Sequence, residues 1–206
     1  MAAMIEYYCT ASSPWTYFGH AAIGAVAGKH GARLDIRPVG LAGVWEVSGG
    51  VPLAKRSATR QRYRLVELQR YSELRGLPIK LKPKYAPVDP SLADLATIAI
   101  LLEGGDPFAF QEMAMKAYWS EEADIADRDV IAGLLEAAGF DAVAILARAG
   151  GEEAAATRQR NTDAAIAADA IGVPAYVLNG EVFWGQDRID LLDRALTTGR
   201  APFKPL

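Results

Sequence analysis

Helical periodicity runs through most of residues 48–168 and separates two short groups of predicted strands. Ahead of this region, Ile5–Thr10 is rich in β-branched and aromatic residues and Arg33–Val39 alternates apolar with charged side chains, so both are predicted strands. Behind it, Ala175–Asn179 and Glu181–Trp184 flank an Asn-Gly pair, which is a strong signal for a β-hairpin. A sheet built from both ends of the chain must therefore accommodate a long helical insertion.

A helix is predicted over Pro14–His30, directly after the first strand. Ser13 is a natural N-cap, Pro14 suits the first helical turn, where its missing N–H costs nothing, and Gly31 is a typical C-cap. Together with the strand Arg33–Val39 this helix makes a β-α-β unit, because the connection is long enough for a parallel, right-handed crossover.

Glycine and proline divide the central region into predicted helices. These helices are expected over Lys55–Leu74, Leu92–Leu102, Phe108–Ser120, Arg128–Ala138, Asp141–Ala149 and Glu152–Ala168. A last, amphipathic helix follows the hairpin, and Asp187 stands where its N-cap would be. The apolar face of this last helix consists of Ile189, Leu191, Leu192 and Leu196.

The order of these elements predicts the fold class. A β-α-β unit, a helical insertion and a proline-led hairpin with a closing helix are the thioredoxin-like arrangement. We therefore expect an α/β, thioredoxin-like fold with a large all-helical insertion. Residues 1–47 and 169–206 would form the thioredoxin-like domain, and residues 48–168 the insertion domain.

Composition narrows the function classes. The 206 residues are 51% hydrophobic and carry a formal net charge of -3, so the chain is not disordered and its overall field does not attract nucleic acid. The start of the chain lacks a basic region followed by an apolar one, and the apolar run Leu95–Leu102 is too short to cross a membrane. We expect a cytoplasmic protein with neither nucleic acid nor membrane as a partner.

Residue types also limit the chemistry. Cys9 is the single cysteine and lies within the first predicted strand, so we interpret it as a small buried apolar residue. A disulfide oxidoreductase needs two cysteines at the start of the first helix, which excludes dithiol chemistry. The two histidines, His20 and His30, are not grouped with carboxylates, so no metal site is expected.

Ser13 is the first candidate catalytic residue. In a thioredoxin-like fold the reactive atom lies at the N-terminus of the first helix, where free N–H groups and the helix dipole stabilise negative charge. A serine hydroxyl there can donate a hydrogen bond to a thiolate that a cofactor brings, and glutathione is the common cytosolic thiol. Helix capping alone explains Ser13 equally well from its local sequence.

Three segments in order carry a family resemblance: Thr10–Tyr17, Gly172–Pro174 and Phe183–Arg188. They resemble the 2-hydroxychromene-2-carboxylate isomerase family, which is close to the kappa-class glutathione transferases and to the DsbA-type fold. Between these segments, further residues are similar to that family's helical insertion, namely Tyr63, Leu68, Arg70, Gly76–Pro78 and Tyr118–Trp119. The resemblance extends over essentially the whole chain.

The resemblance implies a glutathione site. Ser13 corresponds to the catalytic serine that contacts the glutathione sulfur, and Val173, before a cis-Pro174, pairs its backbone with the cysteinyl part. Gln186 and Asp187 hold the γ-glutamyl end. From the residues alone, Pro174 could equally be a trans proline that opens an edge strand, and Asp187 a simple N-cap.

Basic and aromatic residues of the insertion are candidates for further contacts. The family places a cation near the start of its insertion, and Lys55 is favoured over Arg56 and Arg60 as a glutathione contact. A solvated helical face would explain the same charges. Trp15, Tyr85 and Arg188 are the expected substrate contacts, and Trp45 and Trp184 are further candidate walls for an aromatic ring. Lys80, Lys82 and Lys84 would attract an acidic substrate.

The function implied is a glutathione-dependent isomerase of aromatic catabolism. Its substrate would be 2-hydroxychromene-2-carboxylate or a similar small aromatic carboxylate, to which a glutathione thiolate adds and from which it leaves again. One alternative is a kappa-class-like glutathione transferase that conjugates electrophiles. Another is a non-catalytic thioredoxin-like binding module. A homodimer is left open.

Overall fold

The computed structural model describes residues 2–205, and its contacts divide the chain into two compact units. One unit combines the residues up to Gly49 with those from Ala156 onward, and the other comprises Gly50–Ala155. From the sequence, the insertion domain is expected at residues 48–168, and these domain limits remain a prediction. No helix in the described part of the chain is long and apolar enough to cross a membrane.

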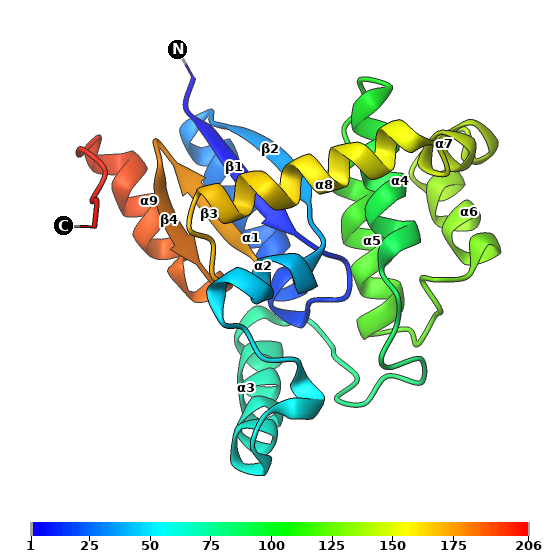
Figure 1. Ribbon diagram of the computed structural model, residues 1–206, viewed down its shortest axis with the longest axis horizontal. Helices are drawn as coiled ribbons and strands as arrows, with labels where there is room; N and C mark the ends of the chain where they lie inside the picture. Colours follow the sequence, from blue (N-terminus) through cyan, green and yellow to red (C-terminus); the bar gives the residue numbers. More distant parts are fainter. Residues whose placement is uncertain (1, 206) are drawn as a thin grey trace. The chain divides into compact units, whose positions relative to one another are not determined.

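The first unit contains the sheet and the helices that cover it (Figure 1). Its elements are β1 (Met4–Cys9), α1 (Pro14–His30), β2 (Arg33–Pro38), α2 (Leu41–Ser48), most of α8 (Glu152–Ala167), β3 (Ala175–Leu178), β4 (Glu181–Trp184), the 3₁₀-helix η2 (Gln186–Arg188) and α9 (Ile189–Thr198). The sheet order is β2-β1-β3-β4. Strand β1 pairs parallel with β2 and antiparallel with β3, and β3 pairs antiparallel with β4. The predicted fold class is thereby confirmed.

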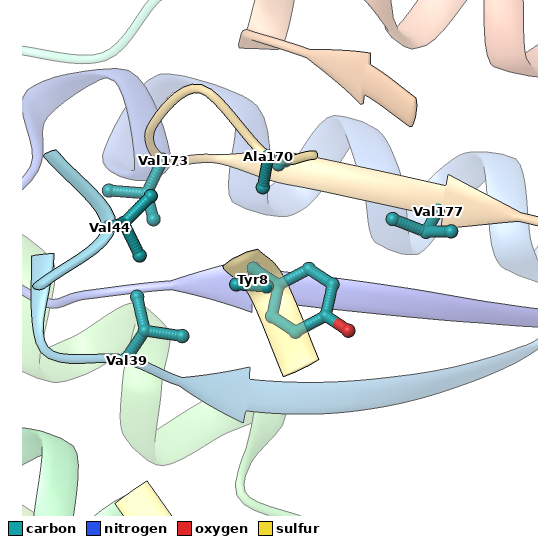
Figure 2. Close-up of a cluster of buried hydrophobic side chains, with 8 residues drawn as sticks. Tyr8, Val39, Val44, Ala170, Val173 and Val177 are labelled. Carbon is teal, nitrogen blue, oxygen red and sulfur yellow. The ribbon is translucent and has the colours of Figure 1, made fainter. Parts of the chain in front are cut away.

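Side chains alternate between the two faces of the sheet, because successive residues of a strand point in opposite directions. Tyr8 belongs to a buried apolar cluster on one face (Figure 2), to which α8 contributes Ala165. Tyr7 points the other way, and its hydroxyl lies 3.2 Å from Nδ1 of His20 in α1. Tyr7 also stacks on Tyr176, its partner in β3, with ring centroids 5.3 Å apart. Figure 1 shows α1 and α8 on opposite faces of the sheet.

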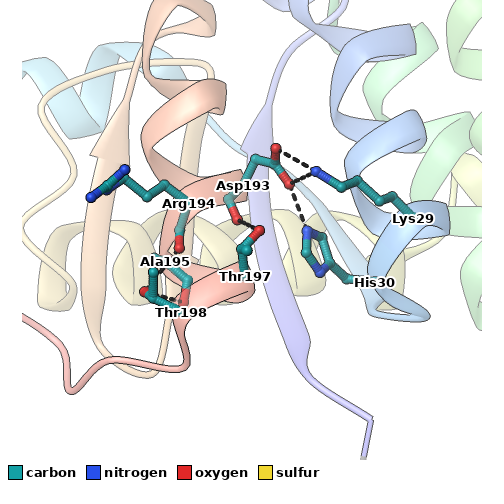
Figure 3. A network of polar contacts seen from close by, with 7 residues as sticks. All are labelled: Lys29, His30, Asp193, Arg194, Ala195, Thr197 and Thr198. Carbon is teal, nitrogen blue, oxygen red and sulfur yellow. Dashed lines mark hydrogen bonds and ion pairs between the residues drawn. The ribbon is translucent and has the colours of Figure 1, made fainter.

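An ion-pair network joins the end of α1 to α9 (Figure 3). Both carboxylate oxygens of Asp193 accept hydrogen bonds from Lys29 Nζ, at 2.9 and 2.8 Å, and Nε2 of His30 lies 2.6 Å from Oδ1. The two basic residues occupy the last turn of α1, where positive charge favours the helix dipole. The network therefore fixes the C-terminal end of the helix that carries Ser13 at its other end.

Helix α2 (Leu41–Ser48) is not among the helices that the sequence predicts. Four features oppose a helix from the sequence: it contains Gly43, Val44 and Val47, and its N-cap, Gly40, has no capping side chain. The helix forms because Val44 packs into the Tyr8 cluster, so tertiary burial outweighs weak local propensity.

The second unit is helical. It contains the 3₁₀-helix η1 (Leu53–Lys55), α3 (Ala58–Arg75), α4 (Ser91–Leu102), α5 (Phe108–Trp119), α6 (Arg128–Ala137) and α7 (Ala142–Ala149). The helix expected from Lys55 begins at Ala58 instead. Ser57 caps it by accepting a hydrogen bond from the N–H of Arg60, and Gly76 ends it in the left-handed conformation.

Candidate functional site

Ser13 caps α1, as the sequence predicts. Its backbone is extended, with φ -87° and ψ 120°, and its Oγ accepts a hydrogen bond from the N–H of Thr16 at 3.2 Å. Pro14 occupies the first helical position, and the first turn contains no acidic residue. No carboxylate in the first turn therefore neutralises the positive end of the helix dipole. This favours the binding of an anion beside Ser13.

The Ser13 hydroxyl also donates a hydrogen bond to the carbonyl oxygen of Val173, at 3.4 Å. Val173 precedes the first paired residue of β3, Ala175, and its peptide bond to Pro174 is cis, as expected from the resemblance. The fold thus brings together two of the predicted glutathione segments. Ser13 is 6% exposed, so the area over which a ligand can reach its hydroxyl is small.

The third predicted segment lies beside the same loop. The N–H of Gly185 donates to the carbonyl oxygen of Pro174 at 2.8 Å, which joins the end of β4 to the residue after Val173. Gly185 has φ 99°, a conformation that favours glycine, and the chain then turns directly into Gln186. Gln186 is 2% exposed, whereas Asp187 is exposed.

The expectation that Asp187 caps the last helix is wrong. The 3₁₀-helix η2 intervenes, so the N-cap position of α9 falls on Arg188, which makes no side-chain capping bond. The carboxylate of Asp187 instead accepts a hydrogen bond from Nη1 of Arg188 at 2.5 Å. Asp187 is therefore not needed to cap the helix, and its exposed carboxylate can meet a cationic ligand group.

Comparison with known proteins identifies the family to which this arrangement belongs. The family described as DSBA-like thioredoxin domain matches residues 4–197. The chain belongs to this DsbA-like family. The 2-hydroxychromene-2-carboxylate isomerase of Pseudomonas putida is 24% identical to it over 196 residues, which are 94% of each protein. Three curated relatives bear that name, and they confirm the expected resemblance and the expected protein class, an isomerase enzyme.

Solved structures agree with the family assignment. A structure of 2-hydroxychromene-2-carboxylate isomerase (HCCA isomerase) covers 95% of this chain and 95% of its own, with a TM-score of 0.80 at 24% identity. The cytosolic disulfide reductase DsbM from Pseudomonas aeruginosa, solved with GSH, covers 94% of this chain and 99% of its own, with a TM-score of 0.68 at 19% identity. Both share the DsbA-like fold of this chain.

The remaining predicted site residues of this DsbA-like chain lie in both units. In the sheet unit, Trp15 is half-buried, with its ring centroid 6.3 Å from that of Phe18. In the helical unit, Lys55 is exposed at the end of η1. Tyr85 is half-buried there, and Lys84 Nζ lies 4.8 Å above the centre of its ring.

The sequence interpretation missed Arg64 in α3. Burial lowers the pKa of this half-buried guanidinium, and the like charge of Arg56 lowers it further. Burial and the charge of Arg60 lower the pKa of Arg56 in the same way. The spacing of four residues places Arg60 and Arg64 on one face of the helix and is the signal that could have revealed them. The three arginines Arg56, Arg60 and Arg64 therefore place positive charge close together at the start of the helical unit.

Proposed function

We propose that the protein is a glutathione-dependent isomerase that acts on 2-hydroxychromene-2-carboxylate or a similar intermediate of aromatic degradation. The observation that carries the proposal is the hydrogen bond from Ser13 to Val173, because it joins the helix N-terminus to the loop expected to bind the glutathione backbone. The names of the three curated relatives support the substrate class. The reducing cytoplasm is the compartment in which glutathione is abundant, and we expect the protein there.

The residues present fit a thiol cofactor. A thiolate needs positive potential and hydrogen-bond donors, and the N-terminus of α1 supplies both without an acidic residue in its first turn. The single cysteine, Cys9, is buried in β1 and leaves the reactive position of the fold to Ser13. The similarity to DsbM, which was solved with GSH, supports glutathione as the source of the thiol.

Each protein group would have a defined part in the reaction. Glutathione, when bound, would supply the nucleophilic thiolate and be regenerated unchanged. The Ser13 hydroxyl would turn from the carbonyl oxygen of Val173 and donate its hydrogen bond to the glutathione sulfur instead. This hydrogen bond would stabilise the sulfur as a thiolate. The carbonyl and N–H of Val173 would bind the cysteinyl backbone. Gln186 and Asp187 would hold the γ-glutamyl group, with the carboxylate of Asp187 facing its ammonium.

Substrate binding would use charges and aromatic rings. Lys55 would contact glutathione. The carboxylate of the substrate would pair with another cation of the helical unit, and our candidates are Arg56 and Arg64. Two half-buried rings, Trp15 and Tyr85, would contact the aromatic part. Arg188 is a further candidate, although its guanidinium is engaged by Asp187.

Product analysis tests this function. The purified protein is incubated with 2-hydroxychromene-2-carboxylate with and without glutathione, and both the isomer and free glutathione are quantified. An isomerase converts the substrate only when glutathione is present and leaves the glutathione concentration unchanged. Stoichiometric loss of glutathione with an aryl halide, without conversion of the chromene, would identify a transferase instead. If the protein catalyses neither reaction with glutathione, the remaining hypothesis is the non-catalytic thioredoxin-like binding module.

A further inference from the structure

Gly19 lies in the interior of α1, against two residues from the other end of the chain. An ideal Cβ on Gly19 would lie 2.7 Å from Oη of Tyr176 and 2.8 Å from Cβ of Gln186. It would also lie 3.5 Å from Cα of Gln186. Real side chains do not approach so closely, so the turn at Gln186 rests against α1 only because residue 19 has no side chain.

A glycine inside a helix weakens it, and Gly19 is therefore unfavourable by local propensity. Gly28 lies in the same helix, and a Cβ added to it would meet no atom within 4 Å, so a side chain could be accommodated there. The contrast shows that Gly19 serves the packing of the turn rather than α1 itself.

The surroundings determine which neighbour would have to move. Tyr176 is fully buried in β3, stacks on Tyr7 and lies in a strand that is paired on both sides. Tyr7 is itself held by the contact of its hydroxyl with His20, the residue after Gly19. The 3₁₀-helix at Gln186 has no strand pairing to fix it. A side chain at position 19 would therefore displace Gln186 before it displaces Tyr176.

We propose that Gly19 is a positioning residue that sets the place of Gln186 and Asp187 relative to Ser13. Ser13 begins α1 and Gly19 lies in its second turn, so one rigid helix carries both the hydroxyl and the surface against which the turn packs. The inference rests on the proposed function, since the distance it fixes is that between the sulfur and the γ-glutamyl group of glutathione. Gly19 touches neither group.

The test compares Gly19→Ala with Gly28→Ala, two identical substitutions in one helix. Glutathione binding is measured by calorimetry and isomerisation by its rate at saturating glutathione. For Gly19→Ala we expect the dissociation constant of glutathione to rise at least tenfold while the rate at saturation changes little, because Ser13 keeps its place. Gly28→Ala should bind glutathione as the wild type does and melt at the same or a higher temperature.

A second variant guards against misfolding of Gly19→Ala. Gly19→Ala with Tyr176→Phe removes the Oη contact but keeps the clash with Gln186, so it should fold and still bind glutathione weakly. Wild-type affinity in either folded variant would overturn the positioning role while leaving the proposed function intact. Absence of glutathione binding by the wild type itself would overturn both.

Discussion

The hydroxyl oxygen of Ser13 lies 3.4 Å from the carbonyl oxygen of Val173, although 160 positions separate the two residues in the chain. The contact connects the N-terminus of α1 with the loop that leads into β3. The same hydroxyl caps the helix, so Ser13 has a structural and a proposed catalytic role at once. Variants must therefore separate lost stability from lost chemistry.

Replacing Ser13 by alanine should affect both roles. Loss of the N-cap should lower the free energy of unfolding by about 1 kcal/mol. Loss of the hydroxyl donor should reduce the glutathione-dependent rate by about 100-fold or more, by analogy with the removal of one donor to a catalytic anion. Asp141→Ala is the matched control, because Asp141 caps α7 by accepting a hydrogen bond from the N–H of Ala144. Asp141→Ala should lower the free energy of unfolding by a similar amount and leave the glutathione-dependent rate unchanged. A similar loss of rate in both variants would show that the effect of Ser13→Ala comes from lost stability.

Replacing Asp187 by asparagine should weaken glutathione binding without weakening the fold. The exposed carboxylate does not cap α9, so thermal stability should remain within a degree or two of the wild type. The KM for glutathione should rise by about tenfold, the equivalent of one charge-assisted hydrogen bond, with kcat nearly unchanged. Asp190→Asn, an exposed acid in the first turn of α9, is the control and should change neither constant. An unchanged KM in Asp187→Asn would remove Asp187 from the glutathione site.

Replacing Arg64 by glutamine should raise the KM for the acidic substrate by about tenfold, because a partly buried cation binds a carboxylate more strongly than an exposed one. The fold should not lose stability, since the substitution relieves repulsion from Arg56. Arg62→Gln removes the same charge from an exposed position of α3 and should leave KM almost unaltered. Equal effects of the two substitutions would point to the general charge of the helix instead of a local site.

The network at Asp193 should make stability depend on acid pH (Figure 3). The hydrogen bonds from Lys29 and then from His30 hold the pKa of the Asp193 carboxyl below its ordinary value. A lowered pKa in the folded state stabilises the fold above the unfolded pKa, about 3.9, and this contribution is lost as pH falls through the lower folded value. The stability difference between wild type and Asp193→Asn, from urea midpoints, should shrink as pH falls below about pH 4. A difference that does not change with pH would refute this role.

Local signals in the sequence predicted the fold well where local rules determine structure. Ser13, Pro14 and Gly31 mark both ends of α1, and the structure places them at those ends because capping involves only neighbouring residues. The hairpin around Asn179 and Gly180 follows from turn chemistry in the same way, and both residues have positive φ.

Features that depend on distant contacts could not be predicted. Helix α2 forms because Val44 packs in the sheet unit, and its own sequence does not favour a helix. Asp187 does not cap α9 because the 3₁₀-helix η2 intervenes, and the turn at Gln186 lies against Gly19, a residue far away in the sequence. For the candidate site, the family resemblance names Ser13, Val173 and Gln186 as an expectation, and the spatial relation of these residues required the fold.

The ionisation of glutathione on the enzyme tests the central claim most directly. The thiolate absorbance of the bound cofactor is titrated with pH in the wild type and in Ser13→Ala. A free thiol of this kind has a pKa of about 8.5, and we expect the wild type to lower it by at least about one unit and Ser13→Ala to restore most of that difference. A bound thiol that titrates in the wild type as it does free in solution would contradict the account.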